Sequence, residues 1–182
     1  PTQEMFENLL AEALVVHRWA MAGETADSMN DKQTSINGSV WIEDESQRIG
    51  NVKIPDSFWK QMRSSKIVFV DIPFEERLNY LTEEYGRFET EKLVNAIIRI
   101  QKRLGGLETK NAVNYLIEKN HKECFRILLK YYDKWYSKGL HNRELVSELL
   151  NEVSFSTVDA GVIAATLINT DKIVADKTLQ TK

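Results

Sequence analysis

The chain has 182 residues, of which 42% are hydrophobic and 28% charged, values typical of a soluble globular protein with its own core. The formal net charge of −3 excludes a generally basic nucleic-acid-binding protein, so any RNA contact requires a local basic patch. The single cysteine, Cys124, excludes an internal disulfide framework and indicates a reducing, cytoplasmic setting, and no apolar run approaches the roughly 20 residues of a membrane span.

The chain opens with a predicted helix followed by a polar stretch. Apolar residues recur at helical spacing from Phe6 to Leu14, and Thr2 is placed to cap this helix. Residues 24–39 are polar and predict a mobile loop. Because the first residues are P-T-Q-E without an initiator methionine, we expect the chain to be a fragment of a longer protein.

The stretch at residues 40–50, V-W-I-E-D-E-S-Q-R-I-G, is central to the interpretation. Its apolar start, residues 40–42, predicts a buried parallel strand. Ligands in open α/β sheets lie beyond the carboxyl ends of the strands, where Glu43, Asp44 and Glu45 would stand. Carboxylates there can orient a nucleophile, and Glu43 and Asp44 could hold a hydrated Mg²⁺. The alternative is a strand that ends in solvated acids.

The residues after the acids are further candidates. Glu43 and Glu45 would project to one face of an extended segment and Asp44 to the other, so the three cannot share one role. Arg48 could neutralise an acid or reach a phosphate, with Ser46 as a second phosphate ligand. A surface salt bridge is the competing interpretation of Arg48.

The rest of the chain predicts a second strand, several helices and a late strand. Pro55 opens a helix, residues 66–72 form a strand, and the two strands with this helix predict a right-handed parallel crossover. Helical stripes then run to about Leu140, with stops at Gly86, Gly105 and Gly139 and a helix start at Thr109. Residues 153–156 predict a third strand, and Thr157 or Asp159 caps a final helix.

The predicted fold is therefore α/β: a truncated P-loop-type parallel sheet with a large helical insertion. We expect one domain, in which residues 1–73 and 144–182 carry the sheet and residues 74–143 form a lid-like insertion. The phosphate-binding pattern G-x-x-x-x-G-K-[ST] does not occur in the chain.

A basic helix end provides a second candidate site. Arg99, Lys102 and Arg103 precede Gly105 and Gly106, where fixed positive charge and close backbone approach could bind an anion or RNA. The alternative is ordinary capping, because cations favour the carboxyl end of a helix.

Aromatic and charged residues interleave further on. The stretch contains Tyr131, Tyr132, Trp135, Tyr136 and Lys138, which could stack unpaired RNA bases. Aromatic residues at helical spacing are also common in cores with a wet edge. The stripe position of Cys124 favours a buried structural thiol, and the three histidines share no metal-ligand spacing.

Five segments, in this order, resemble the C-terminal domain of the tRNA 2-selenouridine synthase family. They are P-T-Q-E-M-F-E-N at 1–8, W-I-E-D-E-S-Q-R-I-G at 41–50, D-I-P-F-E-E-R at 71–77, R-L-G-G at 103–106 and Y-Y-D at 131–133. The resemblance covers the chain to about Arg143, and the E-D-E-S-x-R-I-G run is its most specific motif. Arg77, within the third motif, joins the candidate phosphate ligands.

The resemblance implies a transferase that replaces sulfur by selenium in wobble 2-thiouridine of tRNA. It implies a geranylated intermediate, with geranyl diphosphate and selenophosphate as co-substrates and tRNA as partner. The rhodanese-like domain and Walker A loop of the family are not in this chain, so we expect the isolated chain to be inactive. Two alternatives stay open: a non-catalytic RNA-binding or scaffold module, and a P-loop kinase-like fragment. Whether a nucleotide binds is also open.

Overall fold

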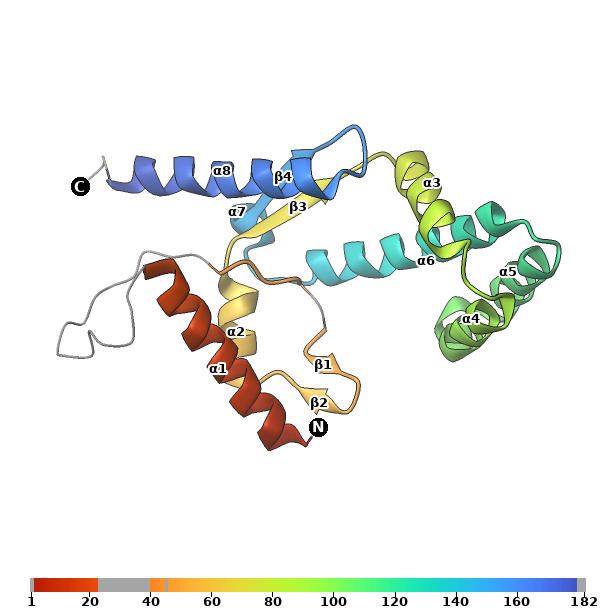
Figure 1. The fold of residues 1–182 in the computed structure, drawn as a ribbon, viewed down its shortest axis with the longest axis horizontal. Helices are drawn as coiled ribbons and strands as arrows, with labels where there is room; N and C mark the ends of the chain where they lie inside the picture. Colours follow the sequence, from red (N-terminus) through yellow and green to blue (C-terminus); the bar gives the residue numbers. More distant parts are fainter. Residues whose placement is uncertain (1, 23–39, 45, 180–182) are drawn as a thin grey trace. The chain divides into compact units, whose positions relative to one another are not determined.

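The computed structural model describes residues 2–22, 40–44 and 46–179. The chain divides into two compact units, Pro1–Ser65 and Lys66–Lys182, and each is described by itself. The described residues form eight helices and two two-stranded sheets (Figure 1), which agrees with an α/β fold rich in helix. The predicted loop at 24–39 lies outside the described residues.

The first unit joins a helix to a β-hairpin. Helix α1 (Gln3–Ala22) is capped as predicted, because the Thr2 hydroxyl accepts a hydrogen bond from the Met5 N–H at 3.2 Å. The Gln3 side chain pairs with both backbone groups of Lys53, at 2.7 and 2.9 Å, and so ties α1 to the hairpin. The hairpin consists of β1 (Arg48–Ile49) and β2 (Val52–Lys53), and α2 (Asp56–Ser64) follows Pro55 as predicted.

The predicted strand at residues 40–42 is wrong. Val40, Trp41 and Ile42 have no regular secondary structure, and 42–48% of their surface is exposed. Strand pairing begins only after the acids, where Gly50 has a φ of +60° at the first position of a two-residue hairpin turn, a position that favours glycine. The R-I-G end of the central motif is therefore a hairpin turn rather than the region beyond a buried strand.

The second unit contains the parallel pair. Strand β3 (Ile67–Asp71) pairs with β4 (Leu150–Ser154), and the Phe155 N–H extends the ladder to the Asp71 carbonyl at 2.8 Å. The predicted crossover through α2 is therefore wrong, since the partner of β3 comes from the far side of the helical insertion. The re-entry of the chain into the sheet after that insertion is confirmed, although the late strand begins three residues before the predicted start at 153.

Four of the helices between β3 and β4 contain the core of the second unit. They are α3 (Phe74–Tyr85), α4 (Thr90–Leu104), α5 (Gly106–Ile117) and α6 (His121–His141). Their buried side chains form one cluster: Leu78, Ile97, Ala112, Leu116, Cys124, Phe125 and Leu129. Each helix contributes to this cluster, so the insertion is held by its own apolar stripes.

Most helix boundaries agree with the sequence, and two do not. Helix α5 begins at Gly106 rather than Thr109, whose buried hydroxyl donates to the Gly105 carbonyl at 2.7 Å. Helix α6 continues past Gly139 to His141 because a single glycine weakens a helix without ending it.

The chain then leads through α7 (Val146–Leu149) and β4 to α8 (Ala160–Leu179), which Asp159 caps as predicted, accepting from the Val162 N–H at 3.0 Å. None of the helices within the described ranges has both the length and the apolar composition to cross a membrane.

Gly105 and Gly106 provide a matched test of the turn between α4 and α5. Gly105 has φ +98° and ψ 151°, a conformation that side chains rarely adopt, whereas Gly106 already belongs to α5, and no atom would meet an added Cβ at either position. We therefore expect Gly105→Ala to lower the free energy of unfolding by about 1–2 kcal/mol through backbone strain alone. Gly106→Ala should change it little, as urea denaturation followed by circular dichroism would show. Equal losses in the two variants would contradict this assignment.

Candidate functional site

The acidic segment of the first unit lies on the surface. Asp44 approaches Arg63 of α2, with Oδ1 and Nη1 3.8 Å apart, and Glu43 is exposed. The Ser46 hydroxyl donates to the Arg48 carbonyl at 2.7 Å, which tightens the entry to the hairpin. Glu45 lies outside the described residues. The catalytic roles predicted for Glu43, Asp44, Glu45 and Arg48, and the phosphate-binding role of Ser46, stay predictions.

The magnesium prediction depends on the donor set around Glu43 and Asp44. Within the described residues, which omit Glu45, no three His, Cys, Asp or Glu side chains gather closely enough to hold a metal ion. Asp44 already has a guanidinium nearby, which competes for the same carboxylate. The Mg²⁺ predicted at Glu43 and Asp44 stays a prediction.

The carboxyl end of β3 is fixed to α6 by Arg77. This side chain, in the first turn of α3, donates from Nη1 and Nη2 to the two carboxylate oxygens of Asp133 at 2.6 and 3.0 Å. Its Nε donates to the Ile72 carbonyl at 3.0 Å. Arg77 and Asp133, the last residues of the D-I-P-F-E-E-R and Y-Y-D motifs, are 56 positions apart and join the two motifs through one bidentate ion pair. Arg77 is committed to this contact, although its predicted role as a phosphate ligand is untested.

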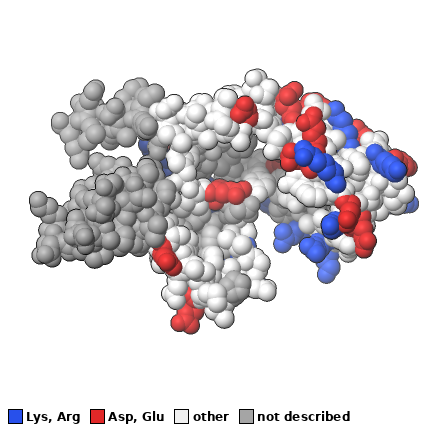
Figure 2. Space-filling view, in the orientation of Figure 1, with Lys and Arg blue, Asp and Glu red and all other residues white. Residues whose placement is uncertain are grey.

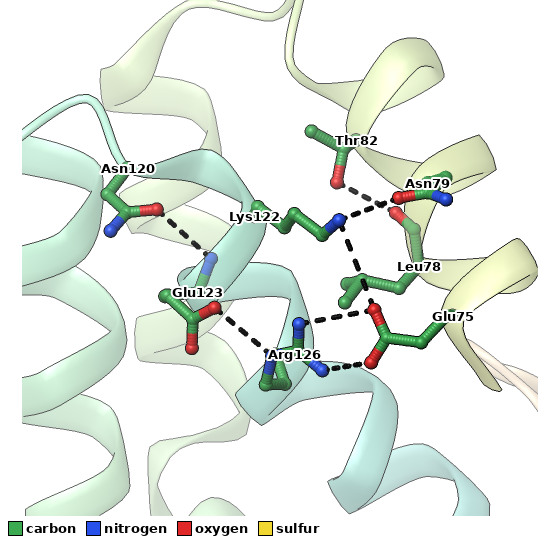
Figure 3. Close-up of polar contacts among 8 residues, drawn as sticks. All are labelled: Glu75, Leu78, Asn79, Thr82, Asn120, Lys122, Glu123 and Arg126. Atoms are coloured by element: carbon green, nitrogen blue, oxygen red, sulfur yellow. Dashed lines mark hydrogen bonds and ion pairs between the residues drawn. The ribbon is translucent and has the colours of Figure 1, made fainter.

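A second ion-pair network joins the same two helices (Figure 3). Arg126 of α6 forms a bidentate pair with Glu75 of α3, and its Nε donates to Glu123 at 3.1 Å. The Lys122 ammonium donates to the side-chain amide oxygen Oδ1 of Asn79 at 2.8 Å and lies 3.9 Å from the Glu75 carboxylate. The hydrogen bond from Arg126 lowers the pKa of Glu75, and the two acids raise the pKa of Arg126. The network therefore stays charged at neutral pH.

Phe74 lies between the two networks. The guanidinium carbons of Arg77 and Arg126 are 5.8 and 5.9 Å from the centre of its ring, so both cations flank one aromatic side chain. Sequence reasoning did not single out Arg126, Lys122 or Asp133 in this role. No local signal could have found them, because their partners on α3 are more than 40 positions away.

The basic residues at the end of α4 are exposed. Arg99, Lys102 and Arg103 lie on its surface, and Gly105 and Gly106 connect it to α5. Figure 2 shows charged side chains of both signs over the α3–α6 helices. The predicted basic residues and glycines are thus exposed near the junction of α4 and α5, and their phosphate-binding role stays a prediction.

The aromatic residues of α6 are partly on the surface. Tyr132, Trp135 and Tyr136 are 44–51% exposed, and Tyr131 makes edge contacts with Tyr132 and Trp135 at centroid distances of 5.2 and 6.3 Å. The Lys138 ammonium lies 5.4 Å from the Trp135 ring centre. The predicted stacking of RNA bases here is compatible with this exposure and stays untested.

Cys124 is a core residue, as its stripe position predicted. It has no exposed surface, and burial raises the pKa of its thiol to about 11. A thiol that is neutral and inaccessible at physiological pH is a poor nucleophile.

The sequence of the chain matches one protein family over most of its length. Residues 1–155 match the family described as the tRNA 2-selenouridine synthase AAA domain. A tRNA 2-selenouridine synthase of Hydrogenovibrio crunogenus is 30% identical over 166 residues, covering 79% of this chain and 42% of that protein. The tRNA 2-selenouridine synthase of Shewanella piezotolerans is 32% identical over 165 residues, covering 75% of this chain and 41% of that protein. The tRNA 2-selenouridine synthase of Nitrosomonas europaea is 34% identical over 85 residues, covering 47% of this chain and 18% of that protein.

No solved structure matches the chain significantly. The chain spans about two fifths of the length of the first two relatives. The family match extends over both units, from the capped first helix through β4, and so includes every motif discussed above. The chain belongs to the tRNA 2-selenouridine synthase AAA-domain family.

Proposed function

We propose that this chain is part of a transferase that replaces sulfur by selenium in wobble 2-thiouridine of tRNA. The observation that carries the proposal is the family match over residues 1–155, supported by relatives named tRNA 2-selenouridine synthase. In the proposed sequence, the thiocarbonyl sulfur takes the geranyl group of geranyl diphosphate with loss of diphosphate. The selenium of selenophosphate then attacks C2 of the geranylated base, geranylthiol leaves with the proton, and hydrolysis of the Se–P bond releases phosphate. A cytoplasmic location follows, since tRNA is the substrate.

The chain would supply only part of this enzyme. We propose that a rhodanese-like domain and a Walker A loop belong to other segments of the same protein, and that the fold is a P-loop-type sheet truncated on that side. Residues 1–73 and 144–182 would form the sheet part, with residues 74–143 as its lid-like insertion. Both donors carry phosphate oxyanions, so cations and backbone amides must surround them. Arg99, Arg103 and the Gly105–Gly106 turn are exposed, and they are the candidates for binding either these donor phosphates or the phosphates of the tRNA backbone.

The test is to express the complete protein in a bacterium that lacks 2-selenouridine synthase and to analyse digested tRNA by mass spectrometry. We expect 2-selenouridine with the complete protein and none with the 182-residue chain. Absence of both 2-selenouridine and geranylated 2-thiouridine from the complete protein would refute the proposed activity.

Two substitutions in the complete protein test the acids. Glu43→Gln and Asp44→Asn should abolish selenium incorporation while tRNA binding stays normal, and Glu4→Gln, on α1, is the control. Full activity in both acid variants would make the acids structural. Calorimetric titration of the protein with Mg²⁺ tests the predicted binding of this ion at Glu43 and Asp44, and the two acid variants are the controls.

A further inference from the structure

The face shared by α4 and α5 carries a shallow open depression of about 660 Å³. Gln101 and Lys102 of α4 and Lys110 and Asn114 of α5 line it, so polar groups come from both helices. Ile98 and Val113 add apolar surface. An open hollow of this kind cannot enclose a small ligand, because small-molecule sites bury most of their ligand's surface.

The charge of these helices differs from that of the whole chain. Residues 90–117 contain five Lys or Arg and two acids, although the chain has a formal net charge of −3. Lys92 pairs with Glu89, whereas Arg99, Lys102, Arg103 and Lys110 form no ion pair with any residue in the described ranges. In contrast, the main cations of the α3–α6 contact are matched by acids.

Helix capping explains only part of this excess. Cations in the last turn of α4 interact favourably with the helix dipole, which accounts for Lys102 and Arg103. Lys110 lies in the second turn of α5, where the helix dipole does not favour a positive charge. Arg99 and Arg103 are four residues apart on one face, so they repel each other. The arrangement therefore lowers stability slightly unless an anion is present.

We propose that the α4–α5 face binds the sugar–phosphate backbone of RNA. Lys102 and Lys110 contact phosphates from opposite sides of the depression, and Arg99 and Arg103 extend the positive surface along α4. Gln101 and Asn114 provide hydrogen bonds to phosphate or ribose oxygens. Backbone contacts of this kind position an RNA without reading its sequence. Only the identification of that RNA as tRNA rests on the function proposed above.

The test measures binding of the 182-residue chain to a labelled tRNA transcript by fluorescence anisotropy at several salt concentrations. Binding to phosphates releases counterions and therefore weakens as salt increases. The variant Lys102→Gln with Lys110→Gln is compared with Lys66→Gln with Lys92→Gln, which loses the same charge. Lys92 is ten residues before Lys102, about 15 Å along the helix and beyond the Debye length of about 10 Å at 0.1 M salt. All four lysines are exposed, and circular dichroism checks that both variants fold.

We expect the Lys102/Lys110 variant to bind the tRNA about tenfold more weakly at 0.1 M salt. The slope of the logarithm of the binding constant against the logarithm of the salt concentration should become shallower by about 1.5, as for two lost phosphate contacts. The Lys66/Lys92 variant should bind like the unaltered chain. An unchanged slope in the first variant, or equal losses in both, would overturn the proposal. Displacement of the RNA by pyrophosphate at matched ionic strength would also overturn it, in favour of a small-anion site. None of these RNA-binding results would change the outcome of the selenium-incorporation assay. A failure of this proposal can therefore be distinguished from a failure of the proposed function.

Discussion

Replacing Leu116 by alanine is expected to lower the free energy of unfolding by about 2–5 kcal/mol. Leu116 is 1% exposed and lies in the buried cluster shared by α3, α4, α5 and α6. Truncation removes buried methyl groups and leaves a cavity that the surrounding helices can only partly close. Because three neighbouring helices contribute to this cluster, the loss should affect the whole insertion rather than α5 alone.

The next residue provides the control. Ile117 is 67% exposed, so Ile117→Ala should change stability by no more than about 0.5 kcal/mol. The free energies of unfolding of the two variants are compared by urea denaturation, followed by the helix signal in circular dichroism. Similar losses for Leu116→Ala and Ile117→Ala would show that the core is not where the structure places it.

The second large effect is expected at the Arg77–Asp133 pair. Arg77→Ala should cost about 2–3 kcal/mol, because it removes a bidentate pair, a bond to the Ile72 carbonyl and contact with Phe74. The Asp133→Asn variant tests the charge with little change of shape. The coupling energy of the Arg77→Ala and Asp133→Asn cycle should be about 1–2 kcal/mol, since the two side chains are only about one third exposed.

An exposed pair at the carboxyl end of α3 provides the comparison. Arg87 and Glu84 lie 2.8 Å apart, but the Arg87 side chain is 70% exposed, so their cycle should give at most about 0.5 kcal/mol. Urea denaturation of the single and double variants supplies both coupling energies. If the Arg77–Asp133 coupling were no larger than that of Arg87–Glu84, the pair would not be the connection between β3 and α6 inferred here.

The helical insertion could be predicted from sequence because its signals are local. Apolar residues at helical spacing and the stops at Gly86 and Gly105 define α3 and α4 without knowledge of their neighbours. The conformation of residues 40–42 could not be predicted correctly, since three apolar residues fit a strand, a buried helix segment or an exposed segment equally well. The return of the late strand to the sheet was predicted, but its direct partner was not, because β3 and β4 are about 80 positions apart in the chain.

In the candidate site, too, the features set by neighbouring residues could be predicted and those set by distant residues could not. The exposed basic end of α4 follows from its sequence, as Arg99, Lys102 and Arg103 are close together in the chain. Arg77 was identified only through its motif, and its commitment to Asp133 became visible only in three dimensions. Lys110 has no distinguishing sequence context, and it gains interest only because α5 places it across the depression from Lys102.

The register of β3 with β4, Ile67 opposite Leu150, has a consequence for the order of folding. Contacts among α3–α6 join segments that are nearer in sequence, and such contacts form quickly, whereas parallel pairing across a long intervening chain is intrinsically slow. Formation of the insertion would hold its two ends near each other and so reduce the entropy lost when the strands meet. The sheet would then be the last part of this unit to assemble, and any substitution that loosens the helices would also delay the strands.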